Sequence, residues 1–230
     1  MRRRLSVLVF ALTVAIACTA KSGSPMPSPP PCDPPVAARA ALNILVLGDS
    51  IAAGDPLTGN DRWSATLERL LAAALLERVV HVCNAAVGGS RIDFLESSIA
   101  GRSDLGSYDV AVVIEGVNDD GFTPLDEWSR RYAAAVATLE AKGLAVVIGT
   151  APPTIVEGRF TDRYQPIAEA LRRIAASEGR LLLDIDRHWR DLGPEEAGPY
   201  YSDLIHQGPA GQAVISGMAA SLIRTVPAAR

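Results

Sequence analysis

The chain has 230 residues, of which 48% are hydrophobic and 21% are charged, and its formal net charge is −4. This composition excludes a chain that is disordered throughout, and the length is enough for one domain with a large core. A mild acidic excess, without a Lys- or Arg-rich run in the body of the chain, argues against nucleic acid as a partner, because binding to phosphates draws on clustered cations.

The first 17 residues have the layout of a signal peptide. Residues 2–4 are three arginines, and residues 5–17 are almost uninterruptedly apolar. The apolar stretch is too short to span a membrane as a helix, and no polar position marks a solvent face. We therefore expect a signal peptide over residues 1–17 and an exported protein.

Cys18 directly follows the apolar stretch. Residues 15–18, Ala-Ile-Ala-Cys, resemble the lipobox of bacterial lipoproteins, in which the Cys is lipidated and becomes the mature N-terminus. The Ala-x-Ala pattern also suits ordinary signal peptidase cleavage. With Cys32 and Cys83 the chain has three cysteines, and lipidation of Cys18 avoids an odd thiol in an oxidising compartment. We predict a membrane-anchored lipoprotein, with a secreted or periplasmic protein as the alternative.

Cys32 and Cys83 are then free to form a disulfide, while Cys83 is equally compatible with a small buried residue in a strand. Residues 18–40 are rich in Pro and Ser and have no apolar periodicity, which is typical of an extended tether. The folded domain is expected over residues 41–230.

Five short apolar runs alternate with longer segments of helical periodicity in that domain. We expect strands at 42–47, 79–84, 110–115, 145–149 and 181–185. Each run is apolar on both faces, as in parallel strands that are covered by helices on both sides. Helical spacing of apolar residues predicts helices around 67–75, 128–139, 167–174 and 209–223. The pattern indicates an α/β fold, a three-layer α/β/α sandwich.

The first strand runs directly into Gly48-Asp49-Ser50. In open parallel sheets, ligands bind beyond the carboxyl ends of the strands. At this strand-to-helix turn the Ser50 hydroxyl can project from the sheet edge, and its N–H can join the positive end of a helix. The alternative role for Ser50 is that of a helix N-cap.

The second and third strands end in further hydrogen-bond donors. The second leads into Gly88-Gly89-Ser90, where the lack of a Cβ lets a backbone N–H approach a ligand, and the third leads to the side-chain amide of Asn118. The N–H groups of Ser50 and Gly89 and the Asn118 amide can converge as an oxyanion hole. Taken alone, each segment is also compatible with an ordinary turn.

Asp203 and His206 lie three residues apart, just before the last predicted helix. At this spacing the carboxylate can fix the imidazole tautomer, and the second ring nitrogen can then take the proton of Ser50. A serine hydroxyl needs this help, because it is a weak nucleophile at neutral pH.

Together these segments resemble the four sequence blocks of the SGNH, or GDSL, hydrolase family. Ser50 matches the Gly-Asp-Ser block, Gly89 the second block, Asn118 the Gly-x-Asn-Asp block, and Asp203 with His206 the Asp-x-x-His block. The resemblance covers approximately residues 42–224. It implies a flavodoxin-like sheet of five parallel strands and ester hydrolysis without a metal or organic cofactor.

The second block departs from the family pattern. Ser90 stands where many members have Asp, so that Gly88 is an alternative to Gly89. Gly89 is preferred, because it lies five residues beyond Asn84, as in similar members.

Other polar and aromatic residues receive structural interpretations. His81 lies within the second predicted strand. The end of the fifth strand carries alternating residues of types that can bind a metal: Asp184, Asp186 and His188. Acidic residues at this place more commonly cap or solvate the strand end, so we expect no metal. The tryptophans suit a sugar site or, more commonly, a core; they are Trp63, Trp128 and Trp189.

The sequence thus predicts a serine ester hydrolase that acts through a covalent acyl-Ser50 intermediate. Asp203 and His206 complete the catalytic group, and the oxyanion hole comes from Ser50, Gly89 and Asn118. The expected substrates are small acyl esters, acetyl esters included, of small molecules or glycans, and the expected state is a monomer anchored through Cys18. The alternative is a non-catalytic, membrane-anchored binding protein with the same fold.

Overall fold

The computed structural model describes residues 32–37 and 41–226. The predicted signal peptide, the lipidation site at Cys18 and most of the predicted tether lie outside the described residues.

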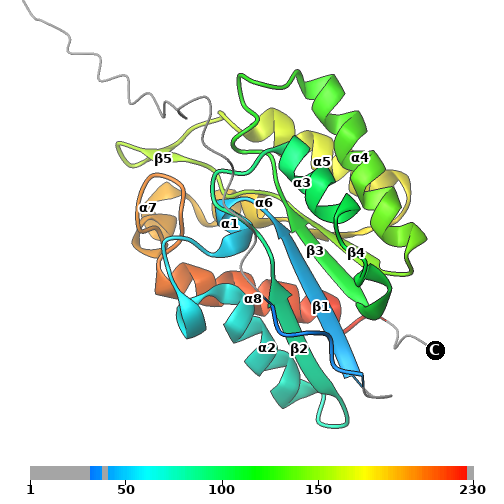
Figure 1. Cartoon of the computed structure of the whole chain (residues 1–230). Helices are drawn as coiled ribbons and strands as arrows, with labels where there is room; N and C mark the ends of the chain where they lie inside the picture. The colour runs from blue at the N-terminus through cyan, green and yellow to red at the C-terminus, as the bar shows by residue number, and fades with distance from the viewer. Residues whose placement is uncertain (1–31, 38–40, 227–230) are drawn as a thin grey trace, which may run out of the picture.

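The centre of the molecule is a parallel sheet of five strands in the order β2-β1-β3-β4-β7 (Figure 1). The strands are β1 (Ala41–Gly48), β2 (Val79–Asn84), β3 (Val110–Ile114), β4 (Ala145–Gly149) and β7 (Leu181–Leu183). Every residue of β1 and β3 is buried, which explains why these two strands are apolar on both faces. The predicted sheet is confirmed.

Helices cover both faces of the sheet. One core contains residues of α1 (Ser50–Ala53), α2 (Trp63–Ala74), α6 (Ile185–Leu192), α7 (Pro194–Ala197) and α8 (Pro209–Ile223). The other contains residues of α3 (Ile92–Ala100), α4 (Leu125–Ala141) and α5 (Gln165–Ser177). Along β1, Ile44 and Val46 face the first core, and Leu45 and Leu47 face the second. The three-layer α/β/α sandwich is confirmed, and all three tryptophans are buried in these cores.

Short elements complete the chain. A hairpin pairs β5 (Ile155–Val156) with β6 (Arg159–Phe160), and single 3₁₀ turns lie at η1 (Gly59–Asp61), η2 (Leu105–Ser107) and η3 (Gly198–Tyr200). The sequence analysis did not predict the hairpin, α3, α6 or α7.

The fifth strand is shorter than predicted, because Asp184 ends it. The Asp184 carboxylate caps α6 by accepting a hydrogen bond from the N–H of Arg187 at 3.1 Å. Arg172 pairs with both Asp184 and Asp186, each at 2.7 Å. The cap formed by Asp184 agrees with the expectation for acidic residues at a strand end, whereas the ion pairs with Arg172 were not predicted. Within the described residues, no group of His, Cys, Asp and Glu is arranged to hold a metal ion.

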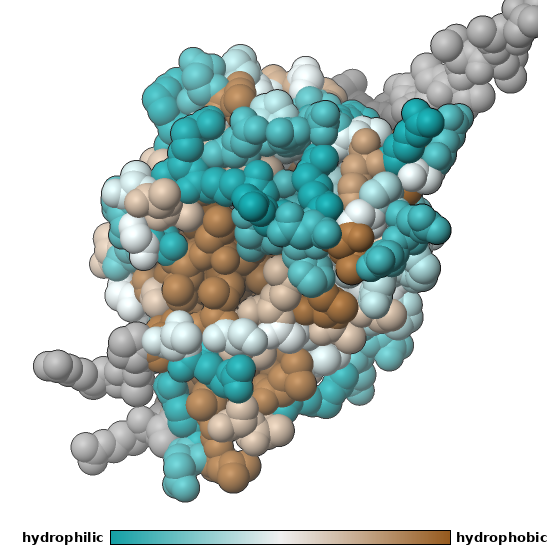
Figure 2. Space-filling view, turned by 180° about the vertical axis from the view of Figure 1, so that it is seen from behind, coloured by the Kyte–Doolittle hydropathy of each residue, from teal (hydrophilic) through white to brown (hydrophobic). Residues whose placement is uncertain are grey.

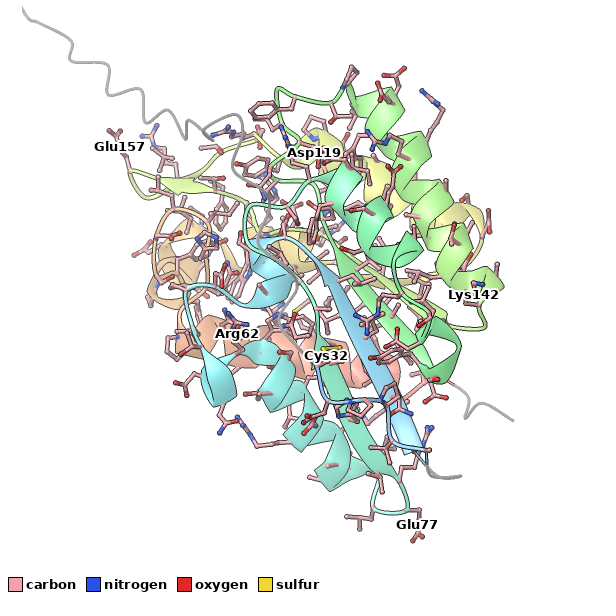
Figure 3. All side chains as sticks on the ribbon, in the orientation of Figure 1. Cys32, Arg62, Glu77, Asp119, Lys142 and Glu157 are labelled. Atoms are coloured by element: carbon pink, nitrogen blue, oxygen red, sulfur yellow. A yellow bond between two sulfur atoms is a disulfide. The ribbon has the colours of Figure 1, made fainter. Side chains whose placement is uncertain are left out.

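Cys32 and Cys83 form a disulfide, which ties the segment 32–37 to β2 (Figure 3). The same segment is bound to β1, because the Asn43 side chain accepts from the N–H of Val36 at 2.8 Å and donates to its carbonyl at 3.1 Å. The Nε2 atom of His81 lies 3.1 Å from the carbonyl oxygen of Asp33, a structural contact as predicted.

The face seen from behind carries a broad hydrophobic area among hydrophilic residues (Figure 2). On α8, the apolar side chains of Val214, Met218 and Leu222 are only partly buried. None of the helices in the described part of the chain has both the length and the apolar character needed to cross a bilayer.

Candidate active site

The turn that carries Ser50 depends on Gly48, the last residue of β1. Gly48 has a φ of +130°, and a Cβ built on it would lie 1.7 Å from the carbonyl oxygen of Ile114 in β3. Only glycine permits this approach. The N–H of Asp49 donates to the same carbonyl at 3.0 Å. The Asp49 carboxylate caps α1 by accepting from the N–H of Ile51 at 2.9 Å, so Ser50 is the first residue of the helix and not its N-cap.

Ser50, His206 and Asp203 form one hydrogen-bonded chain. The Nε2 atom of His206 lies 2.9 Å from Oγ of Ser50, and its Nδ1 atom lies 2.8 Å from Oδ2 of Asp203. A carboxylate can only accept, so Nδ1 carries the proton of a neutral ring and Nε2 accepts from the Ser50 hydroxyl. The structure therefore brings together three residues that the sequence spreads over 156 positions.

The Asp203 carboxylate is fixed by its own turn. Its Oδ1 atom accepts from the N–H groups of Ile205 and His206, both at 2.8 Å. Burial alone would raise the pKa of Asp203. The hydrogen bonds from these N–H groups and the interaction with the imidazole have a larger, opposite effect, so the pKa lies below the ordinary value of a carboxyl. Asp203 is thus ionised at neutral pH, where it can hold the imidazole in one tautomer.

The three predicted oxyanion donors lie on adjoining segments at the same end of the sheet. A Cβ built on Gly88 would lie 3.7 Å from the Cβ of Ser50, so the glycine loop borders the serine. Gly89 has a φ of +80°, and a Cβ built there would meet no heavy atom within 4 Å. Nδ2 of Asn118 donates to the carbonyl of Ser90 at 2.9 Å. The Ser50 N–H belongs to the first turn of α1, where amides have no acceptor within the helix.

The sequence analysis missed a group of buried carboxyls beneath these loops. Asp49, Glu115 and Asp119 are at most 2% exposed, and none forms a salt bridge within the described residues. Burial raises the pKa of Asp49 to about 6, although backbone N–H groups oppose this change. Burial, followed by the nearby charge of Asp49, raises the pKa of Glu115 well above its ordinary value. Burial also raises the pKa of Asp119, which is labelled in the upper part of Figure 3.

Each buried carboxyl joins two segments of the site. Oε2 of Glu115 accepts from the Ser90 hydroxyl at 2.7 Å, and its Oε1 accepts from the N–H of Gly116 at 3.0 Å. Asp119 accepts from the N–H of Ile92 at 3.1 Å and from the hydroxyl of Thr123 at 2.9 Å. The only sequence signal for these roles is an acidic residue at the end of an apolar strand, as at Asp49 and Glu115, or in the loop that follows it, as at Asp119.

Gln212 on α8 joins the elements around Ser50. Its Oε1 atom accepts from the N–H of Trp63 at 2.8 Å, and its Nε2 atom donates to the carbonyl of Gly54 at 2.8 Å. The Trp63 indole in turn donates to the carbonyl of Ala52 at 2.9 Å. The C-terminal end of α1 is therefore held from α2 and α8.

A cavity of about 390 Å³ opens beyond Asn118. Its wall is formed by residues 119–125, which include Phe122, and its other sides by Trp128, Arg163, Pro166 and Ile167. Arg163 pairs with Asp120 across this loop at 2.8 Å.

Comparison with known sequences identifies one family. The model of the GDSL-like Lipase/Acylhydrolase family matches residues 46–214, a range that contains all five residues of the predicted site. A comparison with curated proteins found no match.

Several esterases of known structure have a similar fold. Axe2, an acetylxylan esterase from Geobacillus stearothermophilus, is 17% identical with a TM-score of 0.63, over 81% of this chain and 96% of that one. The acetyl xylan esterase AlAXEase is 16% identical with a TM-score of 0.62, over 78% and 98%. A two-domain esterase active on acetylated mannans is 19% identical with a TM-score of 0.64, over 81% and 50%. At identities this low, the structural similarity shows a shared fold and nothing more.

Proposed function

The chain belongs to the GDSL-like lipase/acylhydrolase family and is a carboxylic ester hydrolase, and from this premise we propose that it cleaves small acyl esters through a covalent acyl-Ser50 intermediate. The observation that carries the proposal is the pair of hydrogen bonds from Ser50 to His206 and from His206 to Asp203.

In the proposed reaction, Nε2 of His206 takes the Ser50 proton while Oγ attacks the ester carbonyl. The N–H groups of Ser50 and Gly89 and the Asn118 amide stabilise the negative oxygen of the tetrahedral intermediate. When the intermediate collapses, the C–O bond to the alcohol breaks and His206 returns the proton to the leaving oxygen. A water molecule then attacks the acyl-serine by the same path and releases the acid.

We further propose that the acyl group is small, with acetyl as the first candidate, and that the substrate is a small molecule or a glycan ester. Support comes from the similar structures, which include esterases named for acetylated xylan and mannan. At 16–19% identity they suggest which esters to try first, not which ester this enzyme cleaves.

The test is a series of 4-nitrophenyl esters of increasing acyl length, measured with wild type and with Ser50→Ala. The proposal predicts the highest kcat/KM for acetate and a loss of about 10³-fold or more in Ser50→Ala, as for enzymes in which a catalytic serine acts as one unit with its base. A Ser50→Ala protein that hydrolyses these esters as fast as wild type would rule out the mechanism. A maximum at long chains would leave the mechanism intact and rule out the acyl assignment.

We also propose that the protein is exported and anchored through a lipidated Cys18. The support is the sequence of residues 1–18. In a bacterial host grown with labelled palmitate, the full-length chain should take up label and sediment with membranes, and Cys18→Ala should do neither. If the wild-type protein takes up no label and stays in the soluble fraction, plain secretion is favoured instead.

A further inference from the structure

Asp55 lies beside the nucleophile, although no sequence block marks it. Its N–H donates to the carbonyl of Ser50 at 3.0 Å, one turn beyond the serine. A Cβ built on Gly88 would lie 2.5 Å from Oδ2 of Asp55 and 3.7 Å from the Cβ of Ser50. The Asp55 carboxylate and the serine side chain therefore approach the same side of one glycine.

The Asp55 carboxylate is held on one side and open on the other. Nη2 of Arg62 lies 3.4 Å from its Oδ1, and Arg62 itself is fixed on the loop between α1 and α2 because its Nε donates to the carbonyl of Leu57 at 2.9 Å (Figure 3). Within the described residues, Oδ2 of Asp55 accepts no hydrogen bond, and 35% of the side chain is exposed. The open oxygen is a hydrogen-bond acceptor at the rim of the site.

Gln212 joins the segment that carries Asp55 to the segment that carries His206. The Nε2 atom of Gln212 donates to the carbonyl of Gly54 at 2.8 Å and lies 3.4 Å from the carbonyl of Gln207, so one side chain joins the segments that precede Asp55 and follow His206. The Asp55 carboxylate also borders the loop of Gly88 and Gly89, which carries a predicted oxyanion donor. In the proposed reaction the leaving oxygen must approach Nε2 of His206. In an acetyl ester, the only hydroxyl groups available to Oδ2 of Asp55 belong to the alcohol part.

Resting on the proposed function, we propose that Oδ2 of Asp55 accepts a hydrogen bond from a hydroxyl of the alcohol part, and that this selects esters of polyols such as sugars. A carboxylate accepts from a neutral hydroxyl with a strong, charge-assisted bond. The carboxylate forms no hydrogen bond with a plain alkyl group, and it repels an anionic group. Asp55 is then a specificity residue that contacts the leaving group and takes no part in proton transfer.

The experiment compares two acetates that differ in hydroxyl groups, glycerol monoacetate and propyl acetate, with wild type and Asp55→Asn. Wild type should prefer glycerol monoacetate. Asp55→Asn should lower its kcat/KM by about 10- to 100-fold, the loss expected for a hydrogen bond to a charged group, and leave propyl acetate within about threefold. With the acetyl ester of lactate, whose alcohol part is anionic, Asp55→Asn should raise kcat/KM. Asp61→Asn, an exposed carboxylate of the same loop, should change none of these values.

Three results would overturn the inference. The first is a wild-type kcat/KM for glycerol monoacetate that does not exceed the value for propyl acetate; this result does not depend on whether the variant folds. An equal loss on both acetates in Asp55→Asn would indicate a structural role. A preference that survives Asp55→Asn but is lost in Phe122→Ala would place the leaving group in the cavity beyond Asn118. Ser50→Ala separates this inference from the proposed function: if it retains activity on both acetates, the mechanism fails and not the role of Asp55.

Discussion

The buried carboxyls are the least expected residues of this molecule. Asp49, Glu115 and Asp119 lie beneath the loops of the candidate site without cationic partners in the described structure. Backbone N–H groups and hydroxyls donate hydrogen bonds to them instead. A buried carboxyl without a cation favours its neutral form, which is why the pKa values of all three are raised. Their role is to hold adjoining loops in register.

The first prediction concerns Glu115 and stability. Its folded pKa lies above the ordinary 4.5, so the folded protein keeps a proton that the unfolded chain releases. The contribution of Glu115 to stability therefore falls as the pH rises above about 4.5, by up to about 1.4 kcal/mol per pH unit. Urea unfolding of wild type and Glu115→Gln should be measured from pH 5 to 8. The free energy of unfolding of the variant should rise relative to that of wild type as the pH rises. Parallel curves would contradict the buried, neutral carboxyl.

The second prediction concerns Ser90, whose hydroxyl donates to Glu115 and whose carbonyl accepts from Asn118. Ser90→Ala leaves a buried carboxyl oxygen without its donor and loosens the loop that carries Gly89. We expect the free energy of unfolding to fall by about 1–3 kcal/mol, and kcat to fall more than KM changes, because the proposed donors act on the transition state. Unchanged kcat in a destabilised variant would show that the contact supports folding alone.

The third prediction follows from the tautomer of His206. Asp203 is ionised throughout the neutral and mildly acidic range, so of the three hydrogen-bonded residues the imidazole of His206 is the group that must lose its proton for the proposed activity. The kcat/KM on a neutral ester should fall on acidification, approaching a tenfold loss per pH unit. A flat acid limb would count against His206 as the base.

The sequence was more informative about the proposed catalytic residues, which the structure joins by hydrogen bonds, than about the residues that support them. Ser50, Asp203 and His206 could be proposed because each lies in a short block with a chemical reason for its residue types. Glu115 was read as the end of a strand, because its partner Ser90 is 25 residues away and only the fold brings them together. Asp55 carries no local signal, since its contact with Gly88 depends on how two loops cross.

At the scale of elements, the site depends on the junction of α1, α2 and α8. The Gln212 side chain bonds to both Trp63 and Gly54 and is 3% exposed. Gln212→Leu keeps the volume but leaves a buried N–H and a buried carbonyl without partners, so the free energy of unfolding should fall by about 2–4 kcal/mol. Ser221→Ala, on the exposed side of α8, is the matched control and should change stability little. Equal stabilities would show that water replaces the lost bonds.

Element boundaries were predictable where apolar periodicity was long. The last helix was predicted at 209–223 and occurs at Pro209–Ile223. The fifth strand was predicted two residues too long, because capping of α6 by Asp184 competes with strand pairing. The β5–β6 hairpin has only two residues in each strand, too few to show alternation.

At the scale of the whole molecule, one crosslink joins the N-terminal segment to the sheet. The Cys32–Cys83 disulfide spans 51 positions. The sequence offered this pair and a free, buried Cys83 as alternatives, because a cysteine count gives no distances. Replacing both cysteines by alanine should lower the free energy of unfolding by about 2–4 kcal/mol. A reducing agent should destabilise wild type by a similar amount and leave the double variant unchanged. Wild type insensitive to reduction would contradict a stabilising crosslink.

The most direct test of the central claim is covalent capture of the nucleophile. Wild type treated with an alkyl fluorophosphonate should gain one adduct mass, and peptide mapping should place it on Ser50. Ser50→Ala should gain none, and His206→Ala should react far more slowly, because the hydroxyl has lost its base. An adduct on another residue, or equal labelling of Ser50→Ala, would contradict the assignment of Ser50 as the nucleophile.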